Sequence, residues 1–449
     1  MKRIYKITQV ALFGALVVGC TDLDTAPLSS TITADQKEDV VAADPSKIEA
    51  SVTAITANFT QYAKIYTEDD NVHSDIGYPT IMLATDSRTT DFVADITGYN
   101  WYSNSADYSD CLSTSTATIE FWGTLYNQIY TANAVIGTVD NETSDPTLQF
   151  YLAQALAIRA FDYFTLVQLY QFNYKGHEDA PGVPIITPEN AEEAAANGCA
   201  RSTVKETYEF ILGDLNKAIE LLANTKKTRS DKRYVSLDVA YGIRARVHLT
   251  MHNYADALKD AEAALASTSS VPYSSAAVSK PTFIDIEDAS WMWGILITDK
   301  DRVSTTGICN FPSHMGSLNY GYASVGGWRR ISPKLYNQIP ESDVRKGWFL
   351  DDTGVSVNLP AAAQAYITKK GAPVYTQVKY GPMNDEWGSN NNATDVILMR
   401  VEEMYFIEAE AVAQQNPAQG VTLLNDFMNN YRDPQYKCTK SNKDDIVKE

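Results

Sequence analysis

Apolar residues recur at intervals of three and four through much of the chain, which is the spacing of one face of an α-helix. The first such segments are residues 48–66, 119–139 and 148–171. The last of these is unusually rich in apolar side chains over its whole length. The pattern predicts three helices in the first half of the chain.

A capping box marks the start of the next predicted helix. Thr203 is followed three residues later by Glu206, and in this arrangement each side chain accepts a free backbone N–H at the helix start. Apolar residues then recur at helical spacing as far as Leu222. Residues 237–250 and 254–267 follow as a pair with small residues on the facing sides, and this pair resembles one tetratricopeptide unit.

A further helical hairpin is predicted near the end of the chain. Its first helix runs from about residue 398 to 414, the turn lies at Asn416-Pro417, and a second helix follows. One hairpin alone buries only one apolar face, so several must stack to form a core. We therefore predict a mainly α fold in which tetratricopeptide-like hairpins form a scaffold over residues 48–269 and 396–449.

Two segments depart from this helical pattern. Residues 67–118 and 270–395 are rich in Ser, Gly, Asn and aromatic residues, which is typical of loops. A short strand-like run at 291–297 places Trp291 and Trp293 on one side by its period of two. We expect large loop-rich insertions with short strands, and residues 270–395 as the ligand-binding face.

The N-terminus has the features of a secretory signal. Basic residues precede a short apolar run, too short to span a bilayer, which ends at Gly19-Cys20. This ending resembles the cleavage site of bacterial lipoproteins, in which the Cys receives the lipid; an ordinary signal with a coincidental Cys is the alternative. We predict a signal peptide over residues 1–19, lipidation of Cys20, and a polar, acidic tether over residues 20–47.

Charge and cysteine content restrict the function. The 449 residues have a formal net charge of −19, which disfavours binding to nucleic acid or to an anionic membrane surface. Five cysteines are too few for a disulfide scaffold. Four of them lie in the body of the protein, and the sequence leaves open whether they form bridges: Cys111, Cys199, Cys309 and Cys438.

An ordered set of segments resembles the SusD/RagB family, the outer-membrane nutrient-binding lipoproteins of Bacteroidetes. No single piece is specific, but together they span most of the chain in the family's order. The segments are residues 20–27, 122–133, 159–164, 181–184, 201–215, 240–254 and 400–411. The resemblance implies four tetratricopeptide-like helix pairs and a loop-rich ligand face.

The same resemblance implies a role and a partner. It implies a surface-exposed lipoprotein of the outer membrane that pairs with a TonB-dependent, SusC-like transporter and captures glycan or peptide for import. Family members usually continue with another helix after a segment like 396–449, so we expect the C-terminal hairpin to be truncated. No cofactor is expected apart from the lipid on Cys20.

Aromatic side chains in the loops are the candidate binding residues, because sugar rings stack on Tyr and Trp while polar groups bind their hydroxyls. The first group lies in one loop, and its Trp and Asn resemble a pair used by the family's glucan binders. The second group flanks glycines in the later insertion. The candidates are Tyr99, Trp101, Tyr102 and Asn104, then Tyr320, Tyr322 and Trp328.

Arg88 and Asp91 are further candidates, either as ligand partners or as a structural pair across a turn. His248 and His252 have helical i, i+4 spacing, but no Glu follows His248, so no metal site is expected. We find no nucleophile elbow, phosphate-binding loop or dinucleotide motif. The crowded carboxylates of 402–410 indicate a solvated helix face rather than a catalytic pair.

We therefore predict a non-enzymatic lipoprotein that binds oligosaccharide and delivers it to a transporter. Peptide cargo on the same fold is the alternative. A helical-repeat scaffold that binds only proteins, and a hydrolase, are less favoured. The first hypothesis requires the loop aromatics to form an exposed ledge.

Overall fold

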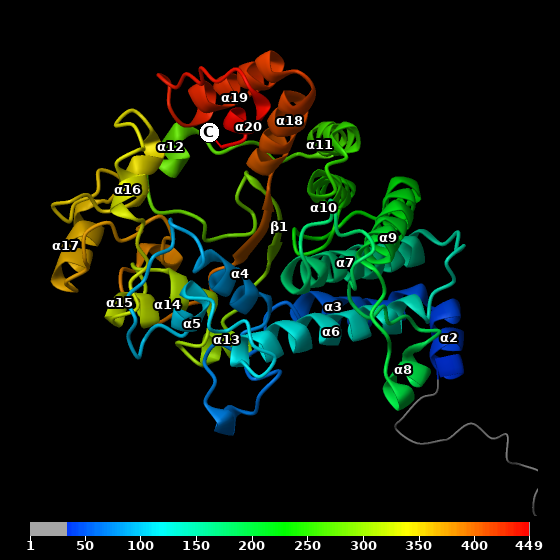
Figure 1. Cartoon of the computed structure of the whole chain (residues 1–449). Helices are drawn as coiled ribbons and strands as arrows, with labels where there is room; N and C mark the ends of the chain where they lie inside the picture. Colours follow the sequence, from blue (N-terminus) through cyan, green and yellow to red (C-terminus); the bar gives the residue numbers. More distant parts are fainter. Residues whose placement is uncertain (1–33, 449) are drawn as a thin grey trace, which may run out of the picture. The chain divides into compact units, whose positions relative to one another are not determined.

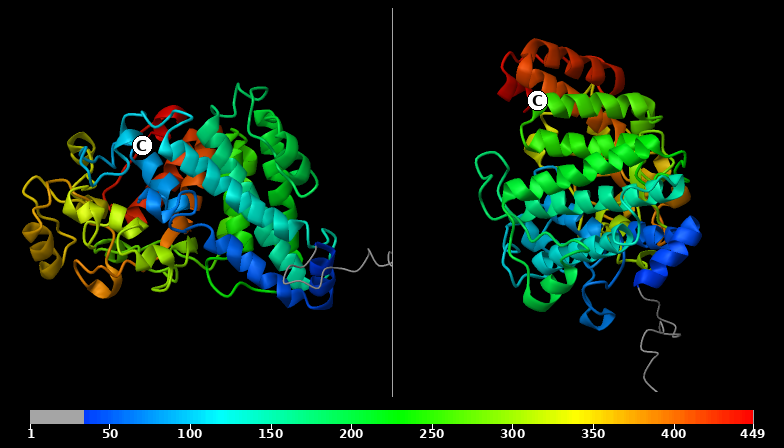
Figure 2. Two further views of the ribbon diagram at one scale, coloured as in Figure 1. Left: turned by 90° about the horizontal axis from the view of Figure 1, so that it is seen from below. Right: turned by 90° about the vertical axis from the view of Figure 1, so that its right-hand side faces the viewer.

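The apolar stripes form a stack of antiparallel helices, described in a computed structural model over residues 34–448 (Figure 1). In the side view the helices lie in successive layers from α3 and α6 up to α19 (Figure 2). Consecutive members of the stack pack against one another. The stack consists of α3 (Glu49–Ala57), α6 (Thr116–Ile136), α7 (Pro146–Tyr170), α9 (Val204–Asn224), α10 (Leu237–Thr250), α11 (Tyr254–Ser267), α18 (Val401–Gln415) and α19 (Pro417–Tyr431).

Helix α7 forms the centre of the first layers. Its side chains from Phe150 to Val167 are all buried, since α6 and α9 both pack against it. Within this apolar packing, Arg159 donates two hydrogen bonds of 2.8 Å to Asp214 of α9 and one of 2.7 Å to Asn133 of α6. This buried network joins three helices.

The predicted helix pairs and the capping box are confirmed. The Thr203 hydroxyl accepts the Glu206 N–H at 3.1 Å, and a Glu206 carboxylate oxygen accepts the Thr203 N–H at 2.7 Å. Helix α3 is shorter than predicted, because the chain leaves the helix at Asn58 and Ala63 adopts a positive φ of 58°. Phe59, the next apolar residue of the predicted helix, enters the core from a loop, whereas Tyr62 is half-buried.

Two strands connect the helical stack to the loop-rich region. β1 (Trp291–Ile295) pairs antiparallel with β2 (Val396–Arg400), about a hundred residues later in the chain. The prediction of a helix from about residue 398 is wrong at its start: the run up to Arg400 is a strand, and the helix begins at Val401. The strand partner lies too far away in sequence for local pattern to reveal it.

Trp291 and Trp293 are both fully buried, but they enter different clusters. Trp291 packs with Tyr273 and Phe283, whereas Trp293 meets Phe59 and Phe161 of the helical stack. The strand ladder is irregular at Trp293 on both sides, which breaks the simple alternation that predicted one common face.

The loop-rich region has small cores of its own rather than open loops. Trp328 belongs to one, with Leu318, Leu350, Ile367 and Val378. Short helices occur in this region and also beside the helical stack (Figure 1). They are η2 (Glu68–Asp70), α4 (Tyr78–Asp86), α5 (Ser103–Ala106), α8 (Ala191–Asn197), α12 (Ser275–Val278), α13 (Arg302–Thr305), α14 (Phe311–Met315), α15 (Tyr322–Val325), α16 (Pro333–Tyr336), η3 (Val344–Trp348), α17 (Ala361–Lys369), η4 (Met383–Asp385) and α20 (Lys443–Ile446).

The chain divides into two units between Lys47 and Ile48. In the first unit the structure describes α2 (Ala34–Ala43), so part of the predicted tether is helical. Alanines and charged residues that favour helices fill this stretch, which explains the difference. Helix η1 (Pro45–Ile48) spans the division. The predicted signal and Cys20 lie outside the described residues.

The four cysteines of the body, Cys111, Cys199, Cys309 and Cys438, are all free thiols. This settles the alternative that the sequence left open for them. Across residues 34–448, none of the helices combines the length and the apolar character needed to cross a membrane.

Candidate functional site

Trp101 lies in an aromatic cluster built from three segments that are distant in sequence. Its indole stacks on His73, with ring centroids 5.1 Å apart and an interplanar angle of 21°. The ring of Tyr322 meets it edge-on at 6.2 Å. Loop 99–108 is therefore held by side chains from residues before and long after it, and Trp101 itself stays half-buried.

Two histidines, His73 and His314, contact Tyr322 of this cluster. The Tyr322 hydroxyl is hydrogen-bonded to Nδ1 of His73, and the ring of Tyr322 stacks on His314 at 4.8 Å. Burial, reinforced by the nearby guanidinium of Arg329, lowers the pKa of His314 to about 3. Burial also lowers the pKa of His73. The cluster is thus uncharged at neutral pH, which suits close packing of rings.

Several predicted binding rings are buried instead of forming a ledge. Tyr102 is 3% exposed, and Tyr322 and Trp328 are each 8% exposed. The neighbouring glycines were expected to let rings point outward, but they serve close approach: a Cβ on Gly321 would collide with Ser313. These three aromatic residues therefore pack in the interior of the loop-rich region and do not form an exposed binding surface.

Other predicted residues do face solvent. Tyr99 is 50% and Tyr320 is 45% exposed, and Asn104 is exposed. Tyr99 lies against Gly326, where any Cβ would meet its ring at 2.6 Å. We call Tyr99, Asn104 and Tyr320, together with the half-buried Trp101, the exposed ledge; the name refers to the solvent exposure of the residues and not to a contact among them. It is smaller than the sequence predicted.

Arg88 and Asp91 do not pair with each other. Nη2 of Arg88 donates to the buried carboxylate of Asp110 at 3.0 Å, and its guanidinium lies 5.6 Å from the ring centre of the exposed Tyr108. Asp91 is exposed and accepts a 2.6 Å hydrogen bond from Thr89. Of the two, Arg88 lines the cavity described next, and Asp91 lines a different one.

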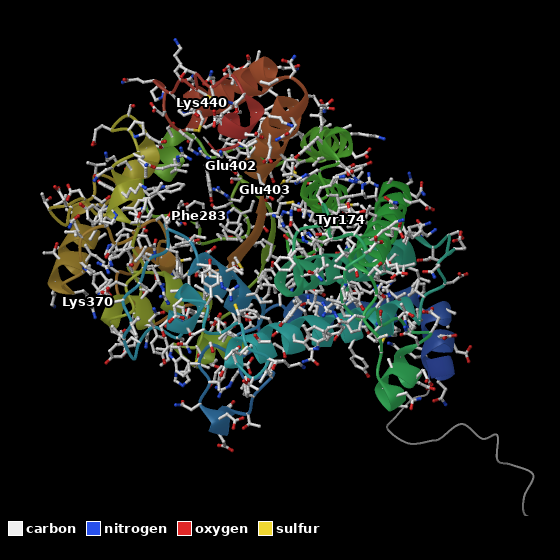
Figure 3. The ribbon with its side chains drawn as sticks, viewed as in Figure 1. Tyr174, Phe283, Lys370, Glu402, Glu403 and Lys440 are labelled. Carbon is white, nitrogen blue, oxygen red and sulfur yellow. The ribbon has the colours of Figure 1, made fainter. Side chains whose placement is uncertain are left out.

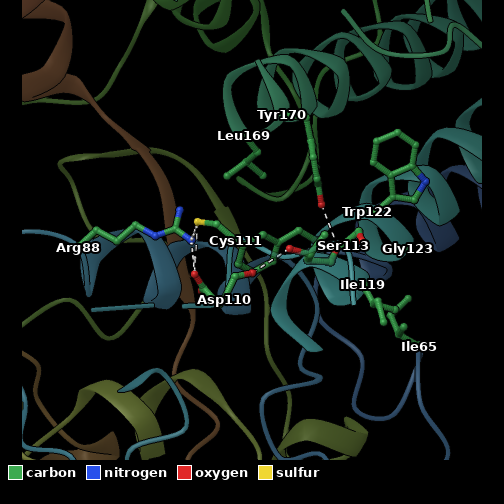
Figure 4. Close-up of a pocket in the computed structure, with 12 residues that line it drawn as sticks. Ile65, Arg88, Asp110, Cys111, Ser113, Ile119, Trp122, Gly123, Leu169 and Tyr170 are labelled. Carbon is green, nitrogen blue, oxygen red and sulfur yellow. Dashed lines mark hydrogen bonds and ion pairs between the residues drawn. The ribbon is translucent and has the colours of Figure 1, made fainter. Parts of the chain in front are cut away.

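A cavity of about 620 Å³ lies where α6 and α7 meet the loop that follows Tyr108 (Figure 4). Arg88, Asp110 and Cys111 form one side of it. The rings of Trp122 and Tyr170, whose centroids are 5.0 Å apart and nearly perpendicular, form another. The cavity is of the size that small ligands occupy.

Sequence reasoning missed most of these cavity residues. Trp122 was assigned to the apolar face of a helix, although it is 36% exposed. Tyr170 ends α7 and Asp110 follows a loop, so neither belongs to a recognisable motif.

The first two carboxylates of α18, Glu402 and Glu403 (Figure 3), have structural partners. Glu402 is buried and accepts hydrogen bonds from Arg432 at 3.0 Å and Ser290 at 2.6 Å. Glu403 pairs with Arg246 through two contacts of 2.6 Å. His248 lies 3.8 Å from Asp260. Among residues 34–448, no group of three or more His, Cys, Asp or Glu side chains is placed to hold a metal ion.

Comparison with known families and structures places this fold. A family model described as "Starch-binding associating with outer membrane", SusD-like, matches residues 35–249. No curated protein matches the chain.

Solved structures extend the likeness over most of the chain. A SusD-like carbohydrate-binding protein from Bacteroides vulgatus is 23% identical, with a TM-score of 0.71, and the match covers 90% of this chain and 78% of that one. A SusD superfamily protein from Bacteroides thetaiotaomicron is 20% identical, with a TM-score of 0.67 and coverages of 86% and 80%. Surface glycan-binding protein A from the same species, solved with laminarihexaose, is 17% identical, with a TM-score of 0.60 and coverages of 90% and 85%.

The chain resembles SusD-like proteins: the family model matches residues 35–249, and the solved SusD-like structure from Bacteroides vulgatus shares the fold over nine-tenths of the chain. The mainly α fold class and the family resemblance are thereby confirmed. Surface glycan-binding protein A, which shares this fold, was solved in complex with laminarihexaose.

Proposed function

We propose that the protein is a non-enzymatic lipoprotein of the cell surface that binds oligosaccharide and delivers it to a TonB-dependent transporter of the outer membrane. The family model, described as starch-binding and associated with the outer membrane, supports this role. The lipid would be carried by Cys20. The observation that carries the proposal is the exposed ledge on a SusD-like fold.

The ledge has the composition that sugar binding needs. Tyr99 and Tyr320 offer exposed ring faces for the C–H faces of a sugar, and Trp101 offers part of its indole. Asn104 lies on the same loop as an exposed hydrogen-bonding group. The His73 stack holds Trp101 in place before a ligand arrives, which reduces the entropy lost on binding.

Titration with a panel of plant, host and microbial glycans tests the proposal. We expect one glycan class to bind and Trp101→Ala to weaken that binding at least tenfold. Asn104→Ala, at an exposed position, tests the ledge without disturbing the core. Tyr130→Ala, an exposed ring on α6 outside the ledge, is the matched control and should bind as the wild type does.

If peptides bind and no glycan binds, the ligand is peptide rather than oligosaccharide, on the same fold. Binding of neither would contradict the proposal. The lipid is tested separately: fatty-acid labelling of the protein in cells should disappear in Cys20→Ala.

A further inference from the structure

The cavity beside α6 and α7 has walls that are mostly apolar, apart from the side formed by Arg88, Asp110 and Cys111. Gly123 allows Ile65 to lie close to the helix, since a Cβ there would be 2.7 Å from Cδ1 of Ile65. Figure 4 is a close-up of this cavity with the side chains that line it. The apolar walls are formed by Ile65, Ile119, Phe121, Trp122, Leu169 and the ring of Tyr170.

Most of the polar groups at the cavity already have partners, although Nε of Arg88 is buried without one. The Asp110 carboxylate accepts hydrogen bonds from Arg88 at 3.0 Å and from Ser105 at 2.5 Å. The hydroxyl of Thr118 donates to the Asp110 carbonyl at 3.0 Å, and the hydroxyl of Tyr170 donates to the Thr118 carbonyl at 2.8 Å. The Arg88–Asp110 pair also balances its own charge.

A sugar ring is therefore a poor occupant of this cavity. Each hydroxyl that enters without a partner weakens binding by roughly tenfold. An aryl or alkyl group makes no such demand and gains from every apolar atom it buries. The perpendicular rings of Trp122 and Tyr170 present the edge and face that an aromatic guest prefers.

We propose that this cavity binds an apolar group, aryl or alkyl, that is attached to the glycan. The inference rests on the proposed function, and it adds a chemical class to the ligand. One loop connects the two places: it carries Tyr99, Trp101 and Asn104 of the ledge and continues to Asp110 and Cys111 of the cavity. The Asp110 N–H donates to the Asn104 carbonyl at 3.3 Å, so a ledge residue adjoins the cavity and a substituted oligosaccharide can contact both.

Two glucosides that differ only in the aglycone test the proposal. Phenyl β-D-glucoside and methyl β-D-glucoside are titrated against the full chain, with ligand-observed NMR to detect weak binding. Burial of a phenyl ring should make the first bind about tenfold more tightly or better. Equal affinities, or no binding of the phenyl glucoside at millimolar concentration, would overturn the proposal.

Variants of the cavity wall show whether the phenyl group binds in this cavity. Trp122→Ala removes one ring, and Ile119→Gln places a polar group on the half-exposed wall; each should abolish the preference for the phenyl glucoside. Tyr130→Ala, on the same helix but outside the cavity, should keep it. A preference that survives both wall variants would place the phenyl group elsewhere and contradict the proposal. Circular dichroism confirms that each variant is folded.

The outcomes separate this proposal from the proposed function. If members of the glycan panel bind but the phenyl group adds nothing, the cavity inference fails and glycan binding stands. If the phenyl glucoside binds through Trp122 while no member of the glycan panel binds, the cavity remains a site for apolar ligands and the glycan function fails.

Discussion

At the scale of single residues, the protein contains buried acids that lack a cationic partner. Glu120 of α6 is 2% exposed and accepts a hydrogen bond from Ser74 at 2.8 Å. Burial, together with the neighbouring Asp75, raises the pKa of Glu120 to about 8. One carboxylate oxygen of Asp75 accepts the N–H groups of Ile65 and Tyr66, and burial raises its pKa also.

Glu120 should make the stability depend on pH in a defined window. Its pKa in the folded protein lies above its ordinary value of 4.5, so the folded state binds more protons between pH 4.5 and about 8. The contribution of this group to stability is therefore greatest below pH 4.5 and is lost as the pH rises to 8. Urea unfolding of Glu120→Gln and wild type should show the variant gaining stability relative to wild type from pH 5 to pH 8. A difference that does not change with pH would contradict this.

At the scale of elements, local sequence predicted the helices well and the loops poorly. The pairs α10–α11 and α18–α19 follow from periodicity, caps and turn residues, all of which act within a few residues. The pairing of β1 with β2 and the burial of Tyr322 depend on contacts across long stretches of chain. For the same reason, the cavity wall formed by Trp122 and Tyr170 was invisible to the sequence pattern.

The capping box of α9 should contribute measurably to stability. Thr203→Ala removes the hydroxyl that accepts the Glu206 N–H, and we expect a loss of about 1 kcal/mol in the free energy of unfolding. Thr203→Ser keeps the oxygen and should stay within a few tenths of wild type. Denaturant titration followed by circular dichroism measures both; a Thr203→Ser variant as unstable as Thr203→Ala would point to the methyl group instead.

At the scale of the second unit, Ile48–Glu449, the loop-rich region is joined to the helical stack through β1. Trp293 is the central contact: its ring lies 5.4 Å from Phe59 and 5.1 Å from Phe161, and its indole donates to the Arg233 carbonyl at 3.1 Å. Because this strand residue packs on α7 and on the loop that follows α3, the two regions should not unfold independently.

Trp293→Ala should therefore destabilise both regions together. We expect a loss of about 3–5 kcal/mol, the usual cost of removing a large buried ring. Far-UV circular dichroism and tryptophan fluorescence should give coincident unfolding curves for wild type and variant alike. Trp122→Ala, which removes a half-exposed indole, is the control and should cost much less. Two separate transitions in the wild type would show that the regions fold as independent modules.

The exposed thiol of Cys111 lies at the edge of the cavity, whereas Cys309 and Cys438 are buried and Cys199 is half-buried. Among the described cysteines, a maleimide dye would consequently attach first at this edge. Its emission would then respond to whatever enters between α6 and α7. A dye on Cys111 would thus report by its fluorescence whether the cavity is occupied.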